Sequence, residues 1–122
     1  TLDTAFSLRC LKRAMQTFGS PGIMNTDQGC QFTSDNWINT LMDADVTISM
    51  DGKGRWVDNV MIERFWRSIK YEDIYLKSYE TPRDLGKGIK SYVLRYNTER
   101  PHSSLSDATP EEMYCENARK AA

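Results

Sequence analysis

The sequence of 122 residues has one histidine, three cysteines and no long hydrophobic run. The lone His102 excludes a histidine-based metal cluster within the chain. Cys10, Cys30 and Cys115 are odd in number and widely spaced, so we expect free thiols in a reducing cytoplasm rather than disulfides or a zinc site. We expect them to be buried as small apolar side chains. No segment has the pattern of a signal peptide or of a membrane span.

A strong charge of either sign is also missing, because the formal net charge is -1 at pH 7. Binding to DNA normally depends on clustered Lys and Arg side chains. If DNA is the partner, the basic residues must therefore gather on one surface. A hydrophobic content of 39% is typical of one small globular domain, which we expect over residues 1–122. The chain begins at Thr1 within a segment of helical periodicity, and we expect it to be part of a longer protein.

Apolar periodicity and capping residues together predict a mixed α/β order of elements. Gly19 and Pro21 would end the first helix, and Thr33, Ser34 or Asp35 would cap the second. Thr81-Pro82 would open the fourth helix, and Thr109 would cap the last. The predicted elements are a helix ending near 18, a strand at 22–25, a helix from about 35, a strand at 46–49, a glycine loop at 50–58, and helices at 59–74, 82–96 and from 110.

The third predicted helix carries a narrow polar stripe opposite a broad apolar face. Asn59, Glu63, Arg67 and Lys70 fall at i, i+4, i+8 and i+11 on this stripe. The apolar face comprises Met61, Ile62, Phe65, Trp66 and Ile69. The stripe places one carboxylate and two cations in line. An ordinary surface pair between Glu63 and Arg67 is the plainer interpretation of this pattern.

A second carboxylate, Asp27, follows the first predicted strand and precedes a turn at Gln28-Gly29. Side chains at such strand ends often project into an open cleft. Between Asp27 and Glu63 lie 35 residues, and the intervening elements could bring both carboxylates to one side of a small sheet. Two carboxylates repel each other unless a cation lies between them, and their hard oxygens suit Mg²⁺ or Mn²⁺. The pattern therefore indicates a candidate metal site.

Three segments resemble the second half of the catalytic core of bacterial insertion-sequence transposases, the branch similar to retroviral integrases. They are TDQGCQFTS, DNVMIERFWRSIKYEDIY and YNTERPHSSLSDATPEEMY. The 35-residue spacing and the basic residue seven positions after Glu63 belong to the resemblance, which covers nearly the whole chain. It implies an α/β, ribonuclease H-like integrase catalytic core, truncated at its N-terminus, with about two strands and four to five helices.

This superfamily is named for an Asp, Asp and Glu triad, and the resemblance implies that Asp27 is its second metal-binding carboxylate and Glu63 its third. Two Mg²⁺ or Mn²⁺ ions held by the full triad would activate a water or a DNA 3′-hydroxyl and stabilise the leaving oxygen. The implied reactions are hydrolytic nicking at the element ends and strand transfer into target DNA. The first Asp would lie before Thr1, and Asp3, in a predicted helix, does not replace it. We therefore expect catalysis by the parent protein and none by this piece alone.

A set of basic and polar side chains is expected to contact DNA. The set comprises Lys70, Arg67, Asn59, Lys53, Arg55, Arg100 and His102. Lys70 and Arg67 share the polar stripe of the third helix, where they would hold phosphates beside the metal ions. For the others plainer interpretations stay open: a solvated loop at 50–58, a helix cap at Asn59, and a loop residue with backbone hydrogen bonds at His102.

Three classes of function stay open. The first is a DNA transposase or integrase, the second a non-catalytic DNA-binding or assembly remnant of a decayed transposase. The third, a ribonuclease H-like nuclease with another substrate, fits the residues after Glu63 less well. The expected partners are the element ends, the target DNA and further copies of the chain, since a missing strand would leave a sheet edge bare. We expect no membrane partner and a place in the bacterial cytoplasm, at the nucleoid when DNA is bound.

Overall fold

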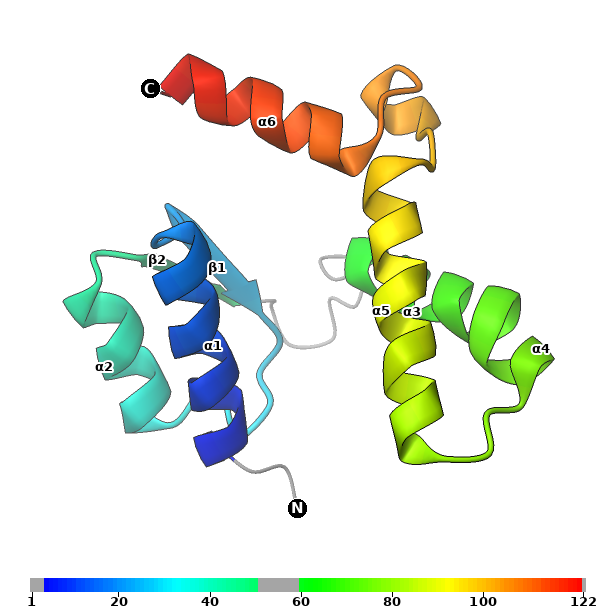
Figure 1. Cartoon of the computed structure of the whole chain (residues 1–122). Helices are drawn as coiled ribbons and strands as arrows, with labels where there is room; N and C mark the ends of the chain where they lie inside the picture. The colour runs from blue at the N-terminus through cyan, green and yellow to red at the C-terminus, as the bar shows by residue number, and fades with distance from the viewer. Residues whose placement is uncertain (1–3, 51–59, 122) are drawn as a thin grey trace. The chain divides into compact units, whose positions relative to one another are not determined.

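The computed structural model describes residues 4–50 and 60–121 (Figure 1). The chain forms two compact units, one up to Ile62 and the other from Glu63. The single domain expected over residues 1–122 stays a prediction. Within the described ranges, every helix is too short or too polar to cross a lipid bilayer.

The first unit contains two helices and a pair of parallel strands (Figure 1). Its elements are helix α1 (Thr4–Phe18), strand β1 (Ile23–Thr26), helix α2 (Asp35–Asp43) and strand β2 (Thr47–Met50). The strands pair in parallel, from Ile23 opposite Thr47 to Thr26 opposite Met50. Parallel neighbours need a crossover connection, which α2 supplies here. Both strands consequently end at the same edge of the sheet.

The core of the first unit is built from the apolar faces of both helices and the residue that precedes β2. Leu11, Trp37, Leu41 and Val46 are buried together. Leu41 is 0% exposed, and burial of a leucine side chain contributes roughly 1.5–3 kcal/mol. The ring of Phe32 packs edge-on against Trp37 with 4.9 Å between centroids. This core packs α2 against the strand pair and thereby holds the strand ends in place.

Local signals set the helix ends of this unit. Gly19 adopts a φ of +84°, and its N–H donates to the carbonyl of Met15 at 2.9 Å. A glycine in the left-handed conformation is a common stop for a helix, and α1 ends directly before it. The hydroxyl of Ser34 accepts the backbone N–H of Trp37 at 3.3 Å and so caps α2. Both ends were expected from the sequence, and both are confirmed.

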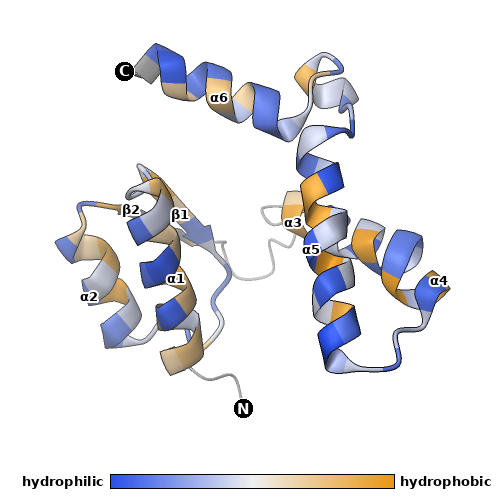
Figure 2. Ribbon diagram, in the orientation of Figure 1, coloured by the Kyte–Doolittle hydropathy of each residue, from blue (hydrophilic) through white to orange (hydrophobic). Residues whose placement is uncertain are grey.

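The second unit is helical. Helix α3 (Val60–Ile69) leads into a π-helical turn (Lys70–Ile74) and the short helix α4 (Tyr75–Lys77), followed by α5 (Pro82–Thr98), a 3₁₀ turn (Ser103–Leu105) and α6 (Pro110–Ala121). Helix α5 contacts both the π-helical turn and α6. Hydrophobic residues recur at every third or fourth position along α5, between hydrophilic ones, as an amphipathic helix requires (Figure 2).

Threonine caps begin the last two helices, as expected. The hydroxyl of Thr81 accepts the N–H of Asp84 at 3.1 Å, with proline in the first turn of α5. Thr109 and Glu112 form a reciprocal capping box, with hydrogen bonds of 2.9 and 3.3 Å between side chains and backbone. The caps satisfy amide groups that a helix leaves without partners in its first turn.

Aromatic rings hold α3 against α5. The Phe65 ring lies 5.0 Å from Tyr96 and 6.5 Å from Tyr92, measured between centroids. Ile69 is 1% exposed and lies one turn after Phe65 on the same side of α3. Edge contacts between rings add about 0.5–1.5 kcal/mol beyond the area that they bury. The second unit thus has a core of its own, formed mainly by rings.

The third helix reaches Ile74 as expected, but its character changes on the way. After Ile69 it continues as a π-helical turn at Lys70–Ile74 and then as α4. The broad apolar face is only partly buried, since Trp66 is 50% and Met61 68% exposed. Periodicity identifies an apolar side, but only the residues within reach of α5 are covered by it.

The other boundaries are close to the predicted ones. Each strand begins and ends one residue later than expected, and Val46 is a buried core residue that precedes β2 rather than part of it. Helix α5 extends to Thr98 instead of 96. The expectation that the cysteines are unpaired is confirmed, but their expected burial is wrong because all three are exposed. Met42, in the same helix as the buried Trp37 and Leu41, is 63% exposed.

Gly88, inside α5, makes room for a side chain from outside the helix. A Cβ atom at this position would overlap the hydroxyl and ring of Tyr79. Tyr79 in turn donates a hydrogen bond of 2.7 Å to the buried carboxylate of Asp73. Glycine inside a helix costs roughly 0.5–1 kcal/mol relative to alanine. The close packing of Tyr79 explains why α5 has glycine here.

We predict that Gly88→Ala destabilises the protein, although alanine is the better helix former, because the new methyl group displaces Tyr79 from Asp73. The matched control is Gly86→Ala in the same helix, where no atom would lie within 4 Å of the new Cβ. This control should stabilise the fold by about 0.5–1 kcal/mol. Urea unfolding followed by circular dichroism measures both changes. Equal stabilisation by the two substitutions would contradict the packing argument.

Candidate functional site

Asp27 lies at the carboxyl end of β1, the edge where open α/β sheets bind ligands. Its side chain is exposed, and Oδ1 accepts the backbone N–H of Gly29 at 2.8 Å. A Cβ atom at position 29 would come within 3.0 Å of this same oxygen, so glycine lets the turn close tightly. The turn therefore sets the direction of the carboxylate while solvent still reaches it.

Glu63 lies in the first turn of α3 and is exposed, as are Arg67 and Lys70. No ion pair joins Glu63 to Arg67 in the part of the chain that the structure describes. The guanidinium of Arg67 lies 5.6 Å from the centre of the Tyr71 ring instead. The plainer interpretation of the stripe as a solvated face is borne out by this exposure, but its ion pair is not found among the described residues. Glu63 faces solvent without that cation attached to it.

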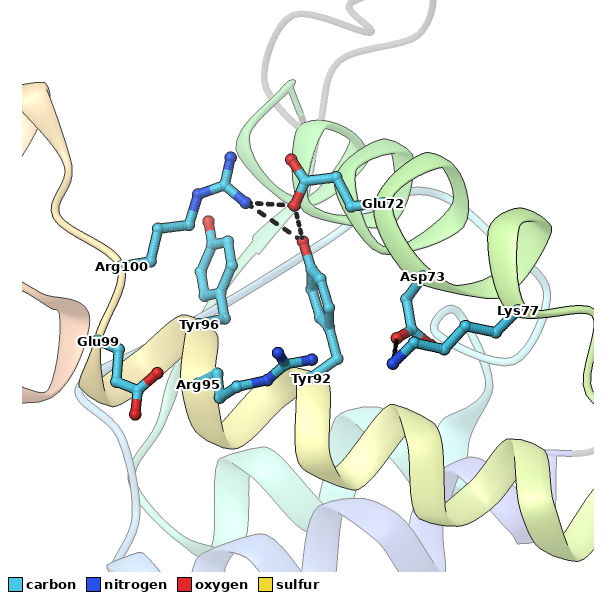
Figure 3. A pocket seen from close by; sticks show the side chains of 8 residues that line it. All are labelled: Glu72, Asp73, Lys77, Tyr92, Arg95, Tyr96, Glu99 and Arg100. Carbon is cyan, nitrogen blue, oxygen red and sulfur yellow. Dashed lines mark hydrogen bonds and ion pairs between the residues drawn. The ribbon is translucent and has the colours of Figure 1, made fainter.

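Lys70 is the first residue of the π-helical turn. Single π-helical turns inside α-helices are often found at functional sites. Here the turn directs Glu72 toward α5, where the hydroxyl of Tyr92 donates to its Oε2 at 2.7 Å (Figure 3). Arg100 donates to the same oxygen at 2.6 Å and to the Tyr92 hydroxyl at 3.3 Å. Glu72, Tyr92 and Arg100 thus form a hydrogen-bonded triad. The triad joins the turn after α3 to α5 and to the loop that follows α5.

The triad borders a pocket of about 370 Å³ in the second unit (Figure 3). Its lining residues are Glu72, Asp73, Lys77, Tyr92, Arg95, Tyr96, Glu99 and Arg100. The lining has as many carboxylates as cations, and most of them neutralise each other in pairs. Arg95 has no carboxylate within ion-pair distance among the residues described. Balanced charge of this kind indicates a structural network rather than an anion site.

The contacts within the triad shift the pKa of its members. The hydrogen bonds from Arg100 and Tyr92 lower the pKa of the Glu72 carboxyl below its ordinary value of 4.5. Burial and the hydrogen bond to Glu72 raise the pKa of Tyr92 to about 12. Glu72 is consequently ionised and Tyr92 neutral throughout the physiological range, which keeps both hydrogen bonds intact.

Asp73 lies next to this triad and is only 1% exposed. Its carboxylate accepts the hydroxyl of Tyr79 at 2.7 Å and pairs with Lys77 at 2.8 Å. Burial alone raises the pKa of Asp73, but the hydrogen bonds from Lys77 and Tyr79 outweigh it, and the pKa lies below its ordinary value of 3.8. A buried carboxylate without such partners would strongly destabilise a fold. The burial of Asp73 within the π-helical turn therefore depends on both Lys77 and Tyr79.

The structure assigns clear contacts to the two residues expected in the loop after α5. The Arg100 guanidinium is held by Glu72 and lies 5.5 Å from the centre of the Tyr96 ring. His102 is half-buried, with its ring 4.9 Å from that of Tyr96, and its backbone N–H donates to the Ala108 carbonyl at 3.1 Å. These contacts favour the plainer, structural interpretation of both residues. Their expected contact with DNA stays a prediction.

The other expected DNA contacts divide into two groups. Arg67 and Lys70 are exposed on the helix of Glu63. Asn59, Lys53 and Arg55 lie outside the described residues. The expected contacts with DNA stay predictions for both groups.

The donors expected to bind a metal are two carboxylates, and their hard oxygens suit Mg²⁺. Asp27 is exposed at the end of a strand and Glu63 is exposed on a helix, so both side chains are accessible to an ion. Within residues 4–50 and 60–121, no three His, Cys, Asp or Glu side chains gather as a metal site would require. The chemistry of these two donors fits a divalent cation.

Comparison with protein families decides the family. The model of the integrase core domain matches residues 44–110, which is more than half of the chain. The chain belongs to the integrase core domain family. The matched range of the integrase core includes Glu63, Lys70, Arg100 and His102, whereas Asp27 precedes it.

Relatives of the integrase core chain include two bacterial proteins. It is 38% identical over 94 residues to the transposase for insertion sequence element IS904 of Lactococcus lactis, covering 75% of this chain and 37% of that protein. It is 33% identical over 103 residues to a transposase-like protein of Haemophilus influenzae, covering 84% of this chain and 48% of that protein. The chain thus spans less than half the length of these curated relatives.

A solved structure has the same fold. The catalytic core domain of HTLV-2 integrase, determined in complex with magnesium in a dimeric form, superimposes with a TM-score of 0.65 at 17% identity. The match covers 89% of this chain and 67% of that one. The expected fold class, an integrase-type α/β core with few strands, is confirmed.

Sequence reasoning missed the residues that hold the second unit together, chiefly Glu72, Asp73 and Tyr79. Part of the pattern was visible, because Leu85, Ile89 and Tyr92 recur at helical spacing and predict an inward tyrosine. A carboxylate that pairs with that tyrosine has no comparable signal. Its partner depends on the π-helical turn, which local sequence patterns do not reveal.

We predict that acid destabilises the integrase core less when Asp73 is replaced by Asn. Since the folded pKa of Asp73 lies below 3.8, its contribution to stability is present above that pH and is lost as the pH falls toward the lowered pKa. Thermal unfolding from neutral pH down to about pH 3 tests this. The wild type should lose more melting temperature below about pH 4 than Asp73→Asn does. Parallel curves would show that Asp73 does not contribute.

Proposed function

We propose that this chain is the second half of the catalytic core of a bacterial DNA transposase. In this proposal the parent protein cuts phosphodiester bonds at the ends of an insertion sequence and joins them to target DNA. The membership of the integrase core domain family carries the proposal. The transposases among its relatives support this choice of reaction.

Asp27 and Glu63 are the proposed catalytic residues, and both would hold Mg²⁺ or, in its place, Mn²⁺. Two observations support them. Asp27 projects from the end of a parallel strand with its direction set by Gly29, and Glu63 is exposed without a cation partner among the described residues. A third carboxylate would come from a part of the parent protein outside this chain. Two metal ions, once bound, would polarise the phosphoryl oxygen and activate the attacking oxygen.

The cations on the helix of Glu63 would position the substrate. Arg67 and Lys70 are exposed in the last turn of α3 and directly after it. A phosphate beside Glu63 would lie within reach of these long side chains, and cations there would offset the repulsion between the carboxylate and DNA. The pairs around Glu72 and Asp73 would keep the end of this helix in place while DNA binds. They would act as positioning residues and not as catalytic ones.

The proposed partners are DNA and a second copy of the parent protein. The dimeric form of the HTLV-2 integrase core supports self-association in a protein of this fold. A bacterial transposase would work in the cytoplasm at the nucleoid, where its DNA lies. The bare edge of the short parallel sheet offers one route to association between copies.

We predict that Asp27→Asn and Glu63→Gln in the parent protein each abolish cleavage and strand transfer on oligonucleotides carrying the element ends. Each rate should fall by more than about 100-fold, since even outer-shell partners of metal ligands typically cost 10–100-fold when changed. The matched controls are Asp43→Asn and Glu80→Gln, which remove exposed carboxylates elsewhere. Radiolabelled oligonucleotides with Mg²⁺ or Mn²⁺ report both steps.

The controls should keep wild-type rates. Activity in either Asp27→Asn or Glu63→Gln would contradict the assignment of that residue. A folded parent protein that binds DNA but neither cuts nor joins it would favour the alternative, a non-catalytic remnant of a transposase.

A further inference from the structure

Helix α1 carries a concentrated positive surface in a chain whose formal net charge is -1. Arg9, Lys12 and Arg13 are exposed and fall within an arc of about 100° around the helix. Leu11 faces the core of the first unit from another side of the helix. No aspartate or glutamate occurs anywhere in α1, from Thr4 to Phe18. The helix therefore presents three positive charges with no negative charge of its own.

The three cations also lack carboxylate partners from elsewhere. In the described ranges, the ion pairs involve Lys77, Arg100 and Lys120, and no carboxylate lies within pairing distance of Arg9, Lys12 or Arg13. The guanidinium carbon of Arg9 lies 5.9 Å from the centre of the Phe6 ring, which carries no charge. These charges are thus available to a negatively charged partner.

Helix α5 provides an internal comparison. Arg83, Lys87 and Lys90 are exposed and lie along one side of it, so this row has the same number of cations as the row on α1, and Arg95 lies apart from it on the same helix. Carboxylates flank this second row, however, because Glu80 precedes it and Asp84 follows Arg83 in the first turn. Carboxylates thus lie within and just before the row on α5, whereas α1 has none between Thr4 and Phe18. Total charge therefore does not separate the two helices, but its arrangement does.

The spacing on α1 suits a DNA strand. Arg9 and Arg13 are one turn apart, about 6 Å along the helix axis. Phosphates on duplex DNA present one negative charge for about every 1.7 Å of helix axis when both strands are counted. The long, planar arginine side chains can pair with adjacent phosphates in a bidentate manner. A helix with cations on one side and its apolar side in the core can therefore lie along the backbone without disturbing the fold.

We propose that the face of α1 formed by Arg9, Lys12 and Arg13 binds the phosphate backbone of duplex DNA, independently of base sequence and of the carboxylates Asp27 and Glu63. The proposal depends on the proposed function in one respect, that DNA is the partner. It adds a second contact region on the first unit. This region holds DNA in place but does not take part in the chemistry.

The test is equilibrium binding of the 122-residue chain to a fluorescein-labelled duplex of mixed sequence, measured by fluorescence anisotropy with EDTA present. The variant is Arg9→Gln/Lys12→Gln/Arg13→Gln, and the matched control is Arg83→Gln/Lys87→Gln/Lys90→Gln. Both remove three positive charges, and glutamine is a good helix former. Circular dichroism and melting temperatures establish that both variants are folded.

We predict that the α1 variant weakens binding about tenfold or more at low salt. The negative slope of log affinity against log salt should become shallower by about 2.7, as the loss of three phosphate contacts requires. The α5 variant should change the slope by less than about 1. A charge-retaining variant, Arg9→Lys/Arg13→Lys, should keep the wild-type slope. Together these results would establish the α1 face as the contact.

Three results would overturn the proposal: no binding of the duplex by the wild type, equal loss in the two triple variants, or no loss in the α1 variant. Because EDTA removes divalent ions, this test does not depend on catalysis. Failure of Asp27→Asn or Glu63→Gln to abolish catalysis in the parent protein would overturn the assigned active site and leave the α1 result unaffected. The two proposals can therefore fail separately.

Discussion

The π-helical turn after α3 is the constraint on which the second unit depends. The turn spans Lys70–Ile74 and contains two successive carboxylates, which point in different directions as neighbours on a helix do. Glu72 meets Tyr92 and Arg100, while Asp73 is buried with Tyr79 and Lys77. Exposed ion pairs are worth little, about 0.2–1 kcal/mol, but a buried carboxylate demands its partners. The requirement to satisfy Asp73 therefore fixes how the end of the Glu63 helix meets α5.

That constraint extends to the loop that resembles transposases most visibly. The arginine and histidine of the segment RPH were natural candidates for contacts with DNA. In the folded chain, Arg100 neutralises Glu72 and His102 packs against Tyr96. The Arg100 contact joins the loop to the π-helical turn that continues the helix of Glu63, and the His102 contact joins the loop to α5. A motif close to a proposed active site can thus serve it by supporting the helix, because a catalytic carboxylate is useful only if its helix is held still.

The first unit solves a different problem, the display of a carboxylate at the end of a short strand. The parallel pair of β1 and β2 has only four residues in each strand, and the core under it is small. The turn through Gly29 sets the direction of Asp27 locally, so the position of this side chain does not require a large sheet. Positive charge, meanwhile, is arranged by helix: α1 has cations alone, whereas α5 mixes both signs. A net charge near zero conceals this difference, and only the arrangement on each helix indicates where a polyanion would bind.

The sequence by itself determined the elements and their ends, because these depend on neighbours within one or two turns. Apolar spacing located the helices, Ser34, Thr81 and Thr109 marked their starts, Gly19 marked a stop, and the motifs identified the integrase core. It also singled out Asp27 and Glu63 as candidates. The tertiary structure alone decided which apolar side chains are covered, so that Trp66, Met42 and the cysteines proved exposed. It alone revealed the π-helical turn, the burial of Asp73 and the partner of Arg100. Those features join residues from different helices, and the free energy of such contacts depends on packing and burial that no local pattern encodes.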